Sequence, residues 1–154
     1  MIKKITGLLL LLASSLALAA PAAYVHEMTG SGSVTTKGQS RPLELGGLLE
    51  SGDVISVAKG GSMTVKFEDG QIVALQENSR FAIEKYEYNQ KKVAESSAVM
   101  SLLSGGMRFI TGVIGGTRKE AIAMKAGTAT IGIRGTDVAI TIAGAQGIPA
   151  DARS

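Results

Sequence analysis

One cation stands out in this sequence, because Arg134 lies between Gly132 and Gly135 in the mostly apolar, β-branched segment 129–140. Its guanidinium group carries five hydrogen-bond donors in a fixed fork, which suits it to bind an anion, a partner protein or carbonyl groups of its own fold. The flanking glycines allow close backbone approach, which favours the last role. Because a buried charge has to be paired, we interpret Arg134 as a structural clamp in a motif that Thr136 completes. Binding of an anion or a partner is the alternative.

The clamp needs acceptors. We expect Arg134 to bond backbone carbonyls or a carboxylate such as Asp53 or Asp137. Arg108, in the segment 106–109, receives the same structural interpretation.

Two aspartates stand beside glycines at expected turns. Asp53 follows Gly52, and Asp69 precedes Gly70. Aspartate side chains commonly bond their own backbone in turns, so we interpret both residues as turn formers rather than as catalysts.

The sequence contains little that could support catalysis. It has one histidine, His26, and no cysteine, which is too few for a tight zinc site without distant carboxylates. The glycine pairs form no phosphate-binding loop, and no serine stands in a nucleophile elbow. We therefore expect a protein that is not an enzyme and that uses no cofactor or metal.

The N-terminus predicts export. Lys3 and Lys4 precede an apolar run, and the segment 17–19 supplies the small residues that a signal peptidase reads. We expect a signal peptide over 1–19 and no stable membrane span after its cleavage; a retained anchor is the alternative. Without Lys3 and Lys4 the net charge falls from +3 to +1, which removes the main argument for nucleic acid as a partner.

The remaining chain, about 135 residues, predicts a single all-β domain. Glycine pairs and polar turns separate short strand-like runs at regular intervals. We expect many short strands in a twisted roll or solenoid-like arrangement, with a β-sandwich as the alternative. The expected divisions are an N-terminal arm with the first strands at 20–45, the main β domain at 46–142 and an irregular tail at 143–154.

The clearest local unit is a hairpin over 62–76. The dipeptide Asp69-Gly70 suits a two-residue type I′ turn, which would place Phe67 opposite Ile72. Elsewhere we expect a strand over 80–88 and flexible chain over 111–116, and the pattern leaves open whether the segment 98–103 begins as a helical turn.

An ordered set of motifs resembles the FecR-domain family of bacterial envelope proteins. The set consists of Leu49-Glu50-Ser51-Gly52-Asp53-Val54-Ile55, Phe67-Glu68-Asp69-Gly70-Gln71, Leu103-Ser104-Gly105-Gly106-Met107-Arg108 and Ala129-Thr130-Ile131-Gly132-Ile133-Arg134-Gly135-Thr136. The last of these is the most specific, and the resemblance covers roughly 46–142.

This resemblance implies a β-rich periplasmic domain. In the iron regulators of the family, that domain receives a signal from an outer-membrane receptor, and a cytoplasmic segment controls a sigma factor. A signal peptide stands here in place of the cytoplasmic segment, so the chain resembles a stand-alone exported member. Family members generally continue through more strands, so we expect a truncated or short variant.

We therefore expect an exported, non-enzymatic module that binds or senses through protein contacts in the periplasm, with an envelope protein as its partner. The alternative is an envelope structural protein that recognises peptidoglycan or surface polysaccharide. That role would favour an exposed aromatic stripe, for which the chain offers Tyr24, Tyr86 and Tyr88 besides its phenylalanines.

Overall fold

The computed structural model describes residues 20–133 and 137–142. The expected signal peptide 1–19, the tail 143–154 and the motif residues Arg134, Gly135 and Thr136 lie outside the described residues. The strands are β1 (Ala23–Thr29), β2 (Gly32–Thr36), β3 (Gln39–Pro42), β4 (Leu48–Leu49), β5 (Val54–Val57), β6 (Ser62–Phe67), β7 (Ile72–Leu75), β8 (Arg80–Glu87), β9 (Ser97–Ile110), β10 (Ile122–Ala126), β11 (Ala129–Ile131) and β12 (Asp137–Ile142). One short helix, α1 (Val113–Thr117), and two 3₁₀ turns (Val93–Glu95 and Lys119–Ala121) complete the described elements.

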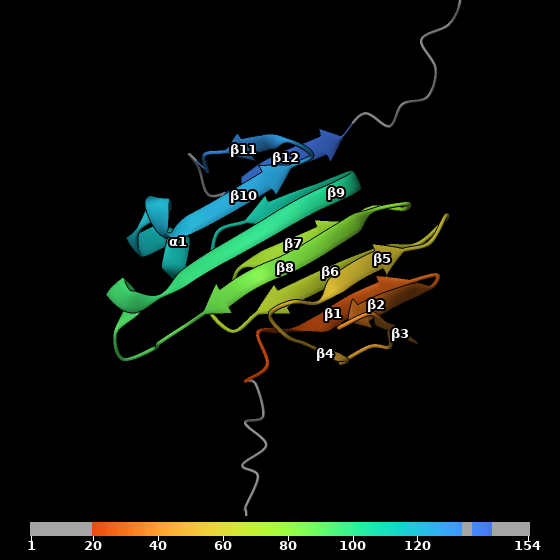
Figure 1. Ribbon diagram of the computed structural model, residues 1–154, viewed down its shortest axis with the longest axis horizontal. Helices are drawn as coiled ribbons and strands as arrows, with labels where there is room; N and C mark the ends of the chain where they lie inside the picture. Colours follow the sequence, from red (N-terminus) through yellow and green to blue (C-terminus); the bar gives the residue numbers. More distant parts are fainter. Residues whose placement is uncertain (1–19, 134–136, 143–154) are drawn as a thin grey trace, which may run out of the picture.

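The strands form a strongly curled sheet, which confirms the predicted all-β roll. Nine strands pair in the order β3-β2-β5-β8-β9-β7-β6-β1-β4, and every pair along this path is antiparallel. The sheet curls around a core of aliphatic, methionine and phenylalanine side chains, and β9 runs along the middle of the molecule (Figure 1). No helix within the described ranges is long and apolar enough to cross a membrane.

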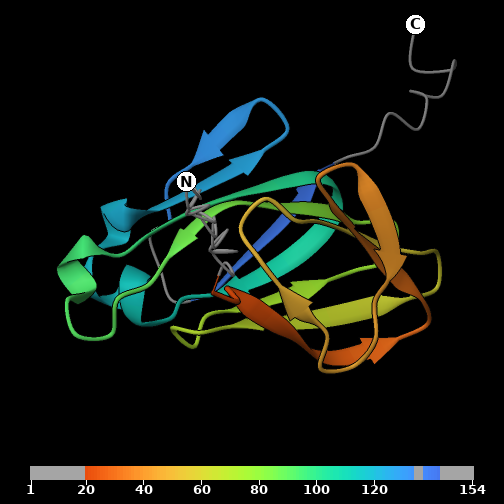
Figure 2. The same ribbon diagram turned by 60° about the horizontal axis from the view of Figure 1, so that its bottom comes forward.

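Strands from the N-terminal stretch 20–45 belong to this same sheet. β1 pairs with β6, and β2 pairs with β5. At the other end of the chain, β10 and β11 form a hairpin that stands out from the body of the molecule (Figure 2).

The long strand β9 connects the two halves of the curl. Its first half pairs with β8 on one side and, in parallel, with β10 on the other; its second half pairs with β7 and β12. The halves meet at Gly105, whose φ of +80° favours glycine. There the buried hydroxyl of Ser79 donates to the carbonyl of Gly106 (2.9 Å) and accepts from its N–H (3.0 Å).

The segment 98–103, for which a helical start was left open, is strand throughout. Ala98, Met100 and Leu102 are fully buried, and the residues between them face the other side of the sheet. Burial that alternates with a period of two residues is typical of a strand and not of a helix. By contrast, the segment 111–116, expected as flexible chain, contains the start of α1, and Ile114 of that helix is buried in the core.

The predicted register of the hairpin over 62–76 is wrong by one residue. Val65 pairs with Val73 and Lys66 with Ile72, and the N–H of Phe67 donates to the carbonyl of Gln71 (2.9 Å). The loop therefore has three residues, of which only the third, a glycine, has a positive φ, and it is not a type I′ turn. The physical reason is burial in the core. The observed register places five side chains on the core face together: Met63, Val65, Phe67, Val73 and Leu75. The predicted register would turn Val73 and Leu75 to the opposite face of the sheet.

We expect Gly105→Ala to destabilise the fold by about 3 kcal/mol, from a left-handed backbone and from crowding. An added Cβ would lie 2.4 Å from Oγ of Ser79 and 2.6 Å from its Cα. The matched control is Gly38→Ala, where φ is +82° and no atom lies within 4 Å of the added Cβ, so about 1 kcal/mol is expected. Urea denaturation of both variants measures the difference, and equal losses would contradict the crowding at Ser79.

Candidate functional site

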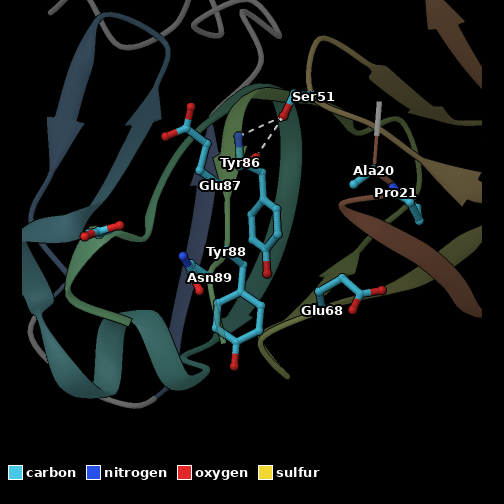
Figure 3. Close-up of a pocket in the computed structure, with 9 residues that line it drawn as sticks. Ala20, Pro21, Ser51, Glu68, Tyr86, Glu87, Tyr88 and Asn89 are labelled. Atoms are coloured by element: carbon cyan, nitrogen blue, oxygen red, sulfur yellow. Dashed lines mark hydrogen bonds between the residues drawn. The ribbon is translucent and has the colours of Figure 1, made fainter. Parts of the chain in front are cut away.

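A pocket of about 650 Å³ lies at the end of β8, beside the start of the described chain (Figure 3). Four regions of the sequence contribute to it: the N-terminal segment, the loop before β5, the β6–β7 loop and the chain from β8 to the 3₁₀ turn. The lining residues are Ala20, Pro21, Ser51, Glu68, Tyr86, Glu87, Tyr88, Asn89 and Glu95.

Tyr86 forms a fixed wall of this pocket. Its ring packs against Phe67, with centroids 5.1 Å apart and ring planes tilted by 44°. Its backbone is held by Ser51, whose hydroxyl accepts from the Tyr86 N–H (2.9 Å) and donates to the Tyr86 carbonyl (3.2 Å). Its phenol oxygen bonds Asp69, so the side chain is anchored at both ends.

Asp69 is a buried carboxylate that three parts of the fold share. Oδ1 accepts from the hydroxyl of Tyr86 (3.0 Å) and from the N–H of Gln71 (3.3 Å), and Oδ2 accepts from the N–H of Ile114 in α1 (3.1 Å). The backbone carbonyl of Asp69 accepts from Val113, and its N–H donates to the phenol oxygen of Tyr86 (2.9 Å). Asp69 therefore ties the β6–β7 loop to β8 and to the first turn of the helix.

The surroundings of Tyr86 keep its hydroxyl protonated. Burial raises the pKa of the phenol well above its usual range, and the negative charge of Asp69 raises it further. Tyr86 therefore acts as a hydrogen-bond donor and an apolar face rather than as an acid or base near neutral pH.

Three exposed carboxylates surround the tyrosines. Glu87 pairs with Lys85 and Glu95 pairs with Lys92, each at 3.3 Å. Glu68 makes no hydrogen bond or ion pair through its side chain with any described residue, although its backbone N–H donates to the carbonyl of Ala22 (3.1 Å).

This arrangement suits binding. Within the described part of the chain, no group of three or more histidine or acidic side chains is placed to hold a metal ion. The pocket instead offers two tyrosines, of which Tyr86 is rigid and largely buried, beside acidic side chains. Aromatic and polar groups of this kind are common in recognition sites.

Asp53 lies at a second, polar pocket of about 500 Å³. Its buried carboxylate accepts from the N–H of Glu50 (2.9 Å) and from the hydroxyl of Thr36 (2.5 Å), and Gly52 beside it has a φ of +94°. These bonds tie the turn before β5 to β2.

The structure places Arg108 on the surface, so the burial expected of it is wrong. The arginine side chain is 62% exposed and donates from Nε (2.8 Å) and from Nη2 to Asp137, linking β9 to β12. The reason is the alternation of β9, in which Met107 and Phe109 point into the core and Arg108 points out. The pairing also engages one of the two carboxylates expected for Arg134, which itself lies outside the described residues.

The other expected residues lie apart from the pocket. Gly132 is exposed after β11, and Gly70 closes the β6–β7 loop with a φ of +84°. His26 lies exposed in β1, with its ring edge-on to Tyr24 at 6.0 Å.

Sequence reasoning missed the pocket itself, because its walls come from segments that are distant in the chain. The local signals are the alternation of Tyr86, Glu87 and Tyr88 at the end of a predicted strand and the two tyrosines as candidates for an aromatic stripe. Nothing in the spacing connects them to Glu68 or to residue 20.

Comparisons with known proteins identify one family. The model of a family described as "FecR protein" matches residues 53–148. A solved structure described as "Cell surface anchoring domain" is similar at 28% sequence identity over 40% of this chain and 83% of that chain, with a TM-score of 0.39. No curated protein matched.

We expect Tyr86→Phe to lower the free energy of unfolding by about 1–3 kcal/mol. Without the phenol hydroxyl, the buried carboxylate of Asp69 loses a hydrogen-bond donor, and the backbone N–H of Asp69 loses its acceptor. Urea denaturation measures the loss, and Tyr88→Phe is the control, expected within about 0.5 kcal/mol.

The same variant tests the pH dependence. Since the folded phenol has a raised pKa, its stabilising contribution is present below the unfolded value near 10 and is lost as pH rises above it. The stability of the unsubstituted protein should therefore fall more steeply above pH 10 than that of Tyr86→Phe; parallel curves would contradict the assignment.

We expect Asp137→Asn to cause a small drop in the melting temperature at neutral pH. Arg108 holds the pKa of Asp137 below its usual range through hydrogen bonds and charge, so the contribution is present above pH 4 and is lost as pH falls through the lowered pKa. Because the pair is exposed, salt should also abolish the effect. In an Arg108→Gln background the substitution should change nothing further, and an undiminished effect there would refute the pairing.

Proposed function

Because the chain belongs to the FecR protein family, whose model matches residues 53–148, we propose that it is an exported, non-enzymatic module that binds or senses through protein contacts in the periplasm. FecR domains are typically periplasmic and regulatory, and they are not enzymes. The expected signal peptide agrees with this location.

The observation that carries the proposal is the pocket at the end of β8. Its volume of about 650 Å³ lies in the usual range of ligand sites and exceeds that of a single side chain. Tyrosines are favoured at protein interfaces because one end is apolar and the other forms hydrogen bonds. We therefore assign the protein contact to this pocket.

The alternative, recognition of peptidoglycan or surface polysaccharide, has weaker support. Tyr86 and Tyr88 lie at the pocket, but Tyr24 lies in β1 against His26, so the three tyrosines form no continuous stripe. The negative rim also suits a cationic surface better than a neutral sugar.

A photo-crosslinker tests the proposal in intact envelopes. We expect p-benzoylphenylalanine in place of Tyr88 to form an adduct with another protein, since that half-buried side chain lines the pocket. The same group in place of Tyr24, also half-buried but outside the pocket, is the matched control and should give little adduct. Absence of a protein adduct at position 88, together with retention of the purified protein on peptidoglycan, would favour the alternative.

A further inference from the structure

The charged side chains that line the pocket are all acidic. Of its lining residues, Glu68, Glu87 and Glu95 are acidic and none is basic. The lysines paired with two of these glutamates are well exposed, with Lys85 at 53% and Lys92 at 67% side-chain exposure. Exposed pairs of this kind contribute little and are readily exchanged, so the rim is available to an incoming cation.

The backbone of Glu68 is held in place at the pocket. Its backbone N–H donates to the carbonyl of Ala22, and the next residue, Asp69, is buried. Its side chain is exposed and has no partner among the described residues. The rings of Tyr86 and Tyr88 lie between Glu68 on one side and Glu87 and Asn89 on the other (Figure 3).

The tyrosine rings add a second attraction for the same ligand. A cation over the face of a tyrosine is drawn to the electrons of the ring, most strongly where water is excluded. The ring of Tyr86 cannot turn away, because Phe67 packs on it and Asp69 holds its hydroxyl. Aromatic faces beside carboxylates favour an ammonium or guanidinium group over an anion or a neutral chain.

From these observations we infer that the pocket recognises a lysine or arginine side chain of an extended segment in the partner protein. The inference rests on the proposed function, because it names the chemistry of the partner at the same pocket. The volume accommodates the long side chain together with part of the adjoining backbone.

The test uses two blocked pentapeptides, Ala-Ala-Lys-Ala-Ala and its norleucine analogue, which differ only in the terminal ammonium group. We expect the lysine peptide alone to shift the backbone amide NMR signals of the pocket residues of the purified ¹⁵N-labelled protein. This binding should weaken as salt is added, because the attraction is electrostatic. Equal shifts with both peptides, shifts elsewhere in the molecule, or no lysine-dependent shift would overturn the inference.

Two pocket variants and a matched control locate the interaction. Glu68→Gln and Tyr88→Leu should each weaken binding of the lysine peptide by roughly threefold to tenfold. Glu44→Gln changes an exposed glutamate outside the pocket and should leave binding unchanged. Unchanged affinity in both pocket variants, or an equal loss in the control, would contradict recognition at this site.

The two experiments can fail separately. A protein adduct at position 88 without a preference for lysine would keep the proposed function and overturn the ligand class. Lysine-dependent binding at the pocket without a protein adduct would support the ligand class and count against protein contact as the function.

Discussion

The fold around the candidate site depends on one buried carboxylate. Burying the charge of Asp69 is unfavourable unless donors replace the water that it loses. The donors come from Tyr86 in β8, from Gln71 just before β7 and from Ile114 in α1, and the first and last of these lie far from Asp69 in the chain. Because all of them must be present together, this requirement links the loop, the strand and the helix. Close packing enforces the same geometry, since a Cβ added at Gly112 would lie 2.6 Å from Oδ2 of Asp69.

This link divides the pocket into a fixed part and an adjustable part. Tyr86 is held by Asp69 and Ser51, so its ring needs no ordering when a ligand arrives, and the entropy cost of binding is smaller. Glu87 and Glu95 are exposed and can exchange their lysine partners for a cation of the ligand. Tyr86 provides a fixed shape, and the exposed carboxylates of Glu87 and Glu95 provide long-range electrostatic attraction.

The sequence predicted the local elements better than the contacts between them. Alternation located most strands, because the longer strands that face the core carry a period-two pattern. The register of the β6–β7 hairpin was missed because the turn dipeptide fits two loop lengths, and only the shared burial of Val65 and Val73 selects one of them. The local bond from Asp69 to Gln71 follows from turn chemistry, whereas the bonds to Tyr86 and Ile114 span 17 and 45 residues. Local spacing contains no information at such distances.

The two turn aspartates show why the motif residues and the candidate site are neighbours rather than the same residues. Asp53 and Asp69 are both buried, and each accepts a hydrogen bond from a hydroxyl group of a distant strand, that of Thr36 in one case and that of Tyr86 in the other. Both carboxylates are therefore engaged in bonds that hold the fold together. Glu68, the residue before Asp69, is different: its backbone is held by a hydrogen bond to Ala22, but its side chain is exposed. A substitution of this exposed neighbour would alter the charge at the pocket without removing the buried bonds of Asp69.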